Sequence, residues 1–165
     1  KYNDNIIEAE DKLDLYEKEI YDSNFSLLSK SLSKELIEDT RMNLLACDEY
    51  ETIGDYQNRI ANRLFMLYEN SIELDEVRAK MAFKLHSLSV ELFNDISRAV
   101  RTNEKELYPI GMKKYQAYYK EVKREHFSRA ENIPARLNTG YLDIINYYKR
   151  IADHTYNIIE YVMKI

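Results

Sequence analysis

Glycine and proline are scarce in this sequence: its 165 residues include three glycines and two prolines. At ordinary usage of about 7% and 5%, roughly 20 of them would be expected in a chain of this length. Because tight turns depend on these residues, a sandwich or barrel of many short strands is excluded. Tryptophan is absent and cysteine occurs once, whereas there are 15 tyrosines. The chain is 45% hydrophobic and 32% charged, so long amphipathic helices are the structure that its composition favours.

Other absences exclude whole classes of protein. Because Cys47 is the single cysteine, a disulfide framework and a zinc site built from cysteines are ruled out. Such low cysteine usage is typical of a protein in a reducing compartment. No run of 18 uncharged apolar residues occurs, so we expect no part of this chain to span a membrane. Lys1 stands where an initiator methionine would, and no signal-like segment follows it. We therefore expect a processed or expressed piece of a longer polypeptide.

Charge is distributed unevenly along the chain. The net charge is −5, but residues 1–75 carry 8 basic and 18 acidic side chains, whereas residues 76–165 carry 16 and 11. The acidic excess disfavours nucleic-acid binding. We expect two solvated surfaces, or self-association through opposite charges. Cation binding by the acidic half and contact of the basic half with an anionic membrane are the alternatives.

Apolar residues recur with helical spacing through the chain. The clearest stripe has intervals that alternate between four and three residues: Leu137, Tyr141, Ile144, Tyr148, Ile151, Thr155, Ile158, Val162 and Ile165. It predicts a helix over 134–165, and similar stripes predict helices over 4–30, 33–70, 74–99 and 104–131. We expect breaks at 22–24 (or merely a kink), 70–71, 101–103 and 131–134, and first turns at Pro109 and Pro134. The sequence thus predicts an all-α, elongated antiparallel bundle of about five long helices.

Two segments are similar at an offset of 98 residues. Residues 52–61 align with residues 150–159, and three of the ten positions are identical: two isoleucines and one aspartate. In both segments a small residue, Gly54 or Ala152, directly precedes the aspartate. Glycine in a helix interior costs about 1 kcal/mol relative to alanine. We therefore expect another helix to approach Gly54 closely.

These segments resemble the two copies of the PhoU signature, which reads approximately Glu-Arg-Ile-(Gly/Ala)-Asp-His, with Asn-Ile shortly after. The resemblance is carried by Glu51, Ile53, Gly54 and Asp55 in the first copy and by Arg150, Ile151, Ala152, Asp153, His154 and Asn157 in the second. The resemblance is narrowed to one group within the family by two further stretches, Arg-Glu-His-Phe-Ser-Arg at 124–129 and Tyr-Leu-Asp-Ile-Ile at 141–145. With them, the sequence is similar to the C-terminal cytoplasmic region of bacterial sodium/phosphate cotransporters.

The resemblance implies two PhoU-like three-helix repeats. Residues 1–72 would hold the last two helices of the first repeat, whose first helix would be missing, and residues 73–165 all three of the second. It also implies a regulatory or assembly domain at the cytoplasmic face of the bacterial inner membrane. Such a domain would be attached to a membrane-embedded transport domain of the same polypeptide, outside the transport pathway. An apolar face left uncovered by the missing helix leads us to expect a homodimer.

Two other functions remain open at this point. One is a free-standing PhoU-type phosphate-signalling regulator, which would contact a phosphate-uptake complex and a sensor kinase. The other is a carboxylate-based metal-binding helical bundle. No phosphate-binding glycine loop, nucleophile elbow or zinc-protease motif is present, so we predict no catalytic residue.

The resemblance also suggests a metal site, because some relatives bind iron or zinc clusters at the signature. Glu51 and Asp55 share a helix face, and Asp48 adds a third carboxylate. We expect three acidic residues of the preceding predicted helix to face them: Glu10, Asp14 and Glu17. In the second copy Lys149 replaces the glutamate, so an ion pair with Asp153 is the alternative to metal ligation there. A solvated acidic face is the alternative at the first copy.

None of the three histidines follows the Glu-x-x-His pattern of ferritin-like di-iron sites. For His154 we expect a hydrogen bond at the bundle surface, with metal ligation as the alternative. For His126 we expect an exposed basic helix face; contact with an anion such as phosphate, together with Arg124 and Arg129, is the alternative. The acidic neighbours of Cys47 predict a raised thiol pKa, which argues against a nucleophile.

Overall fold

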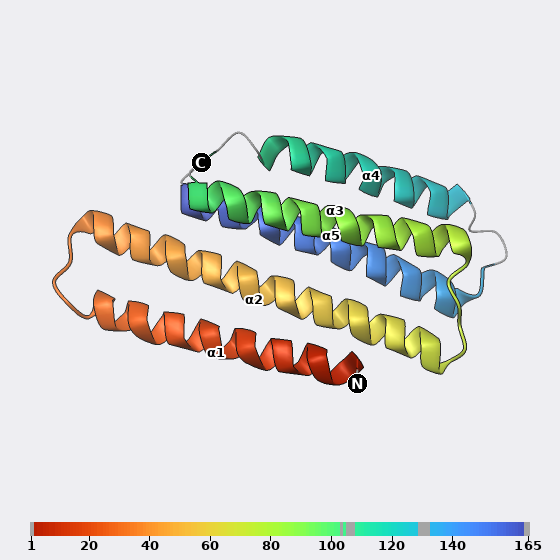
Figure 1. Ribbon diagram of the computed structural model, residues 1–165, viewed down its shortest axis with the longest axis horizontal. Helices are drawn as coiled ribbons and strands as arrows, with labels where there is room; N and C mark the ends of the chain where they lie inside the picture. The colour runs from red at the N-terminus through yellow and green to blue at the C-terminus, as the bar shows by residue number, and fades with distance from the viewer. Residues whose placement is uncertain (1, 103, 105–107, 129–132, 164–165) are drawn as a thin grey trace.

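A computed structural model describes residues 2–102, 104, 108–128 and 133–163, and within these ranges it contains five α-helices (Figure 1). The helices are α1 (Tyr2–Leu28), α2 (Lys34–Glu69), α3 (Glu76–Thr102), α4 (Tyr108–Ser128) and α5 (Ala135–Met163). They lie roughly along one long axis, each antiparallel to the one before it (Figure 1). The prediction of an all-α bundle is confirmed. In the part of the chain that is described, no helix is long and apolar enough to cross a membrane.

Serine residues mark both the start and the end of α2. Ser33 caps α2, since its side chain accepts a hydrogen bond from the Leu36 backbone N–H. At the other end of α2, Ser71 adopts a left-handed conformation with φ 53°, and the Ile72 N–H donates to the Leu67 carbonyl. This six-to-one bond usually accompanies a glycine, and here serine takes that position. The break predicted at 70–71 is therefore confirmed.

At residues 22–24 the break is wrong, because α1 continues through them to Leu28, in agreement with the helix predicted over 4–30. The alternative, a kink, stays a prediction. The Asn24 side chain donates to the Ile20 carbonyl one turn earlier, so it bonds within the helix instead of ending it. Pro109 lies in the first turn of α4, as predicted. Pro134 instead lies one residue before α5, where its carbonyl accepts the hydrogen bond of the Asn138 N–H.

The C-terminal helix α5 is the centre of the bundle. Among the residues that the structure describes, it packs against α2, α3 and α4, whereas α1 packs against α2 alone. The predicted stripe of α5 is buried from Tyr141 to Ile158. A second row, Ile145, Ala152 and Ile159, is buried as well, because helices cover α5 on more than one side. A single stripe in the sequence therefore underestimated how much of α5 lies in the core.

The offset of 98 residues reappears as an approximate twofold relation between the antiparallel helices α2 and α5. Glu49 contacts His154, and Tyr56 contacts Tyr147. Tyr147 lies 98 residues after Glu49, and His154 lies 98 residues after Tyr56. The two contacts are therefore related by the offset, with the roles of α2 and α5 exchanged. By the same relation α4 is the equivalent of α1, while no helix in the described residues is the equivalent of α3. The division at residues 72 and 73 falls between α2 and α3, and the separation into two repeats stays a prediction.

Gly54 lies where α1 approaches α2 closely. A Cβ atom at Gly54 would be 2.5 Å from the Leu13 Cδ1 atom, which is closer than real carbon contacts. The expected helix contact is therefore present, and its partner is α1. Close approach of the two helices explains why glycine is used in a helix interior despite its cost.

We expect Gly54→Leu to push α1 away from α2, because α2 is the one helix that contacts α1 in the described part of the chain. Amide hydrogen exchange in residues 5–28 should become at least about tenfold faster, equivalent to about 1.4 kcal/mol, while exchange in α5 changes little. Gly54→Ala is the matched control. It needs only a shift of one leucine methyl and gains about 1 kcal/mol of helix propensity. Equal protection of α1 in Gly54→Leu and the native chain would show that this contact does not position α1.

Candidate functional site

The second signature copy holds α5 against α2. Its His154 Nδ1 lies 2.6 Å from Oε2 of Glu49, and the Asn157 side chain donates to the other oxygen of Glu49 at 3.2 Å. The Tyr56 ring stacks on His154 with centroids 5.5 Å apart. The Glu49 side chain is only 12% exposed, so this carboxylate depends on its two partners. The hydrogen bond expected for His154 is present, and it joins two helices.

Sequence reasoning missed Glu49, although a signal for it exists. Glu49, Ile53 and Tyr56 are spaced four and three residues apart, so they share one face of α2. Ile53 is buried on that face, and Tyr56 contacts α5. A charged residue in register with a buried stripe indicates a buried polar partner on the facing helix.

The first signature copy lies beside α1 and is acidic. The pKa of Glu51 is raised by burial and by the charges of Asp55, Glu17 and Asp14. The expected approach of the α1 carboxylates is therefore confirmed for two residues. The third, Glu10, instead accepts a hydrogen bond from the Asn58 side chain at 2.6 Å.

Other partners already occupy the carboxylates predicted to bind metal. Asp48 accepts the Tyr21 hydroxyl at 2.5 Å, and Asp55 forms an ion pair with Arg59 at 2.9 Å. In the second copy Lys149 and Asp153 form the expected ion pair at 2.5 Å. Among the residues that the structure describes, no group of three or more His, Cys, Asp or Glu side chains could hold a metal ion. The arrangement does not fit a metal site as it stands, and iron or zinc binding stays a prediction.

His126 is buried, so the exposed position expected for it is wrong. Its side chain is packed against the Tyr141 ring, and its Nε2 lies 2.7 Å from Oδ1 of Asn138, at the start of α5. Arg124 is exposed and does not share this environment, and Arg129 lies outside the described residues. His126 faces inward because it follows Tyr115 and Val122 on the buried stripe of α4. Anion contact by these residues stays an untested prediction.

Burial lowers the pKa of His126 from its ordinary value of 6.5. Folding therefore favours the neutral ring, so this contribution to stability is present above about pH 6.5 and is lost as the pH falls through the lowered pKa. We expect the midpoint of urea unfolding to fall between about pH 7 and pH 5. His126→Gln, which can still bond to Asn138 but cannot titrate, should remove much of that fall. The raised pKa of Glu51 acts in the opposite direction, because it makes the folded state more stable as the pH falls. If the urea midpoint of His126→Gln depends on pH as steeply as that of the native chain, the acid sensitivity comes from another group.

Cys47 is buried and free, and the prediction of a raised thiol pKa is confirmed. Burial is the largest cause, followed by the charges of Glu17, Asp48 and Glu51. A thiol in this setting is a poor nucleophile at neutral pH.

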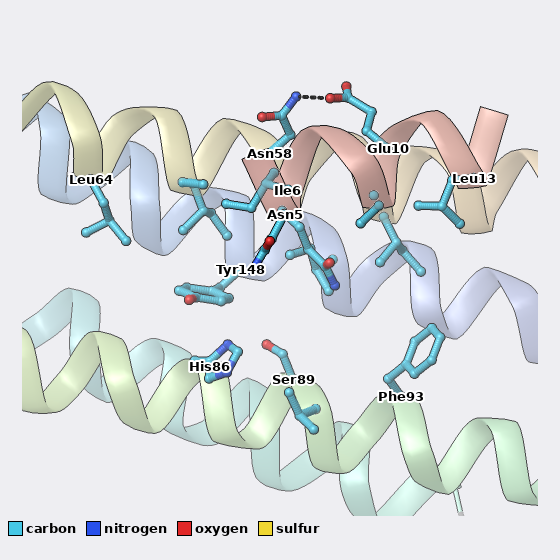
Figure 2. A pocket seen from close by; sticks show the side chains of 18 of the residues that line it. Asn5, Ile6, Glu10, Leu13, Asn58, Leu64, His86, Ser89, Phe93 and Tyr148 are labelled. Atoms are coloured by element: carbon cyan, nitrogen blue, oxygen red, sulfur yellow. Dashed lines mark hydrogen bonds between the residues drawn. The ribbon is translucent and has the colours of Figure 1, made fainter. Parts of the chain in front are cut away.

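A groove of about 980 Å³ lies between α1, α2, α3 and α5 (Figure 2). Its floor and walls are largely apolar and include Leu13, Ile53, Ile60, Phe93 and Ile151. Figure 2 shows side chains of α1 and α2 on one side and of α3 on the other, pointing into the space between them. The hydrogen bond between Glu10 and Asn58 lies at its rim (Figure 2).

A comparison with protein-family models matches residues 79–162 to the PhoU domain, and these residues are just over half of the chain. This chain belongs to the PhoU family. The match spans most of α3 and all of the described α4 and nearly all of α5, so it includes the second signature copy with His154 and Asn157. No curated protein and no solved structure matches the chain.

PhoU membership indicates a role in the regulation of phosphate transport. PhoU domains are regulatory helical domains that act in the cytoplasm. In this PhoU domain the signature residues of α5 are structural: His154 and Asn157 bind Glu49, and Ile151 and Ala152 are buried. Arg150 is exposed on the outside of the bundle.

Proposed function

We propose that this PhoU domain is the cytoplasmic regulatory or assembly domain of a bacterial sodium-dependent phosphate cotransporter. The observation that carries the proposal is the PhoU match at 79–162 together with the resemblance of the stretches 124–129 and 141–145 to cotransporter C-terminal regions. In this proposal the domain lies at the inner face of the plasma membrane. Its partner is a membrane-embedded transport domain of the same polypeptide, and the ions do not pass through the helical bundle.

The complete gene tests this proposal directly. We expect its reading frame to encode about ten membrane-spanning segments before Lys1. Reconstituted in liposomes, the full-length product should take up radiolabelled phosphate only when a sodium gradient is imposed. A start codon directly before Lys1 would instead favour a free-standing PhoU-type regulator, which should then co-purify with a phosphate-uptake complex or a sensor kinase.

Association of two copies belongs to the same proposal. Within the described ranges α1 packs against a single helix, and its exposed side chains include Leu15, Tyr16 and Ile20. Such apolar surface favours a homodimer. Sedimentation equilibrium of the 165-residue chain should show dimers at concentrations of tens of micromolar, and a strict monomer there would exclude this part of the proposal.

Metal binding at Asp48, Glu51 and Asp55 is a separate proposal, supported by the repulsion that raises the pKa of Glu51. A cation would relieve that repulsion if the side chains rearranged around it. Elemental analysis after incubation with iron(II) or zinc(II) should find metal in the native chain and less in Glu51→Ala. Glu76→Ala, which removes an exposed carboxylate of α3, is the control. Equal metal content in all three would exclude a site at the signature.

A further inference from the structure

Of the five described helices, α4 is the most basic. It carries four lysines and one arginine against two glutamates, a net charge of +3 with its histidine neutral. α3 carries five basic and three acidic residues, and α5 three of each, whereas α1 carries two and eight and α2 four and eight. The uneven charge of the sequence is therefore separated in space, because α4 and α1 lie on opposite edges of the bundle (Figure 1).

The cations of α4 form a stripe on its solvent side. Lys113, Lys120 and Arg124 are spaced seven and four residues apart, so they share one face of the helix, the basic stripe. All three are exposed, and no carboxylate among the described residues pairs with them. Val122 is buried on the opposite face, so the basic stripe points out of the bundle. Phe127, which is exposed and follows Lys120 by seven residues, continues the same face.

The two glutamates of α4 lie beside the basic stripe and not in it. Glu121 and Glu125 each directly follow a residue of the stripe, and successive residues of a helix point about 100° apart. Lys114 follows Lys113 in the same way, and it pairs with Glu91 of α3 at 2.8 Å. This flank of α4 therefore faces α3. The solvent side of α4 presents cations and one aromatic ring, without a carboxylate.

A face of this composition suits the surface of an anionic bilayer. Lysine is depleted at protein–protein interfaces, whereas clusters of basic residues on a helix are typical of contact with anionic lipid headgroups. An aromatic ring on the same face enters the headgroup layer. The α1 helix of a second copy is acidic too, but its exposed Leu15, Tyr16 and Ile20 would find no apolar surface along the cations of the stripe.

The acidic helices do not cancel this attraction. α1 contacts α2, α2 contacts α5 and α5 contacts α4, and packed helices are about 8–10 Å apart. At least about 20 Å therefore separates α1 from α4, which is more than twice the Debye length at physiological salt. The separated charges instead orient the domain, because an anionic surface attracts α4 and repels α1.

We propose that the outer face of α4 docks on the anionic lipid headgroups of a bilayer, with Lys113, Lys120 and Arg124 at the surface and α1 turned away from it. The proposal rests on the function proposed above, which places the domain beside a membrane, and it adds which side of the domain faces the lipid. Each basic residue close to an anionic membrane strengthens binding by about fivefold, so the three together contribute about 100-fold.

Binding of the 165-residue chain to vesicles tests the proposal. We expect it to co-sediment with vesicles made of equal parts of phosphatidylcholine and phosphatidylglycerol, to bind them more weakly as the salt concentration rises, and not to bind phosphatidylcholine alone. The triple variant Lys113→Gln, Lys120→Gln and Arg124→Gln should bind the anionic vesicles about 100-fold more weakly. The exchanged side chains are exposed and glutamine is a good helix former, so the variant should fold as the native chain does.

The matched control is a second triple variant, Lys12→Gln, Lys18→Gln and Lys34→Gln. It removes three exposed cations from α1 and α2, so it changes the net charge by the same amount on the side that is turned away from the lipid. We expect it to bind within about threefold of the native chain, because these positions lie beyond the Debye length from the bilayer. Only the position of the charges distinguishes the two variants.

The orientation of the domain is measured with a single tryptophan, since the native chain contains none. Phe127→Trp and Tyr16→Trp replace aromatic side chains of almost equal exposure, 58% on α4 and 59% on α1. With anionic vesicles, the fluorescence of Phe127→Trp should shift to shorter wavelength and be quenched by brominated lipids, whereas that of Tyr16→Trp should not change. The same response from both variants would contradict the orientation.

Three results would overturn the proposal. One is equal binding of the two triple variants, and another is a native chain that does not distinguish anionic from neutral vesicles. The third is self-association of the native chain that only the α4 variant abolishes, without vesicle binding, which would assign the basic stripe to a second copy. The gene tests the transporter function separately: failure to bind vesicles leaves that function standing, and a free-standing regulator that docks through α4 would contradict the transporter function alone.

Discussion

Replacement of Ile158 by alanine should lower the free energy of unfolding by about 2–5 kcal/mol, the usual cost of removing three carbons from a packed core. Ile158 is completely buried in α5, the helix that α2, α3 and α4 all contact. A cavity at this position therefore weakens the helix that, among the described elements, joins α1 and α2 to α3 and α4. In a chain of this size the thermal midpoint should fall by about 5–15 °C. Circular dichroism during urea and thermal unfolding measures both quantities.

The matched control is Ile37→Ala, which makes the same chemical change in α2 where the side chain is 45% exposed. Its effect should stay within about 0.5 kcal/mol, because little apolar surface is lost and alanine has the higher helix propensity. Equal destabilisation by the two variants would mean that the core is not centred on α5.

The helices could be predicted from the sequence because local signals agree along most of their length. The stripe from Leu137 to Val162 keeps one spacing for seven turns, and a pattern that long leaves no alternative to a buried helix. The scarcity of glycine and proline removed the competing turns. The prediction of a break at residues 22–24 failed because asparagine and serine stop a helix only if their side chains bond outside it, and Asn24 bonds inside.

Contacts between distant helices were harder to predict. Gly54 signalled a close helix approach, but the sequence did not tell which helix approaches. His126 was expected outside because its neighbours Arg124 and Lys123 are basic, whereas its distance of four residues from Val122 places it on the buried stripe. The resemblance implied an apolar face left uncovered beside the first two helices, but not the groove itself, which arises because α1 and α3 do not contact each other in the described residues.

Among the polar interactions, the contact of Glu49 with His154 should contribute most to the free energy of unfolding. We expect His154→Ala to lower the free energy of unfolding by about 1.5–3 kcal/mol, the range for hydrogen bonds to a charged group with little access to water. The variant leaves a carboxylate that is 12% exposed with Asn157 as its remaining side-chain partner, and it removes the ring that stacks on Tyr56. Urea unfolding of the single variants, Glu49→Gln and the double variant gives the coupling between the two side chains.

Lys149→Ala provides the control on the same helix. Its ion pair with Asp153 is more exposed, at 44% and 38% of the two side chains, so its loss should cost only about 0.3–0.5 kcal/mol. The difference between the two variants separates a polar contact that joins α2 to α5 from one that stays within α5. If both variants cost the same and Glu49 shows no coupling to His154, the second signature copy does not hold the helices together.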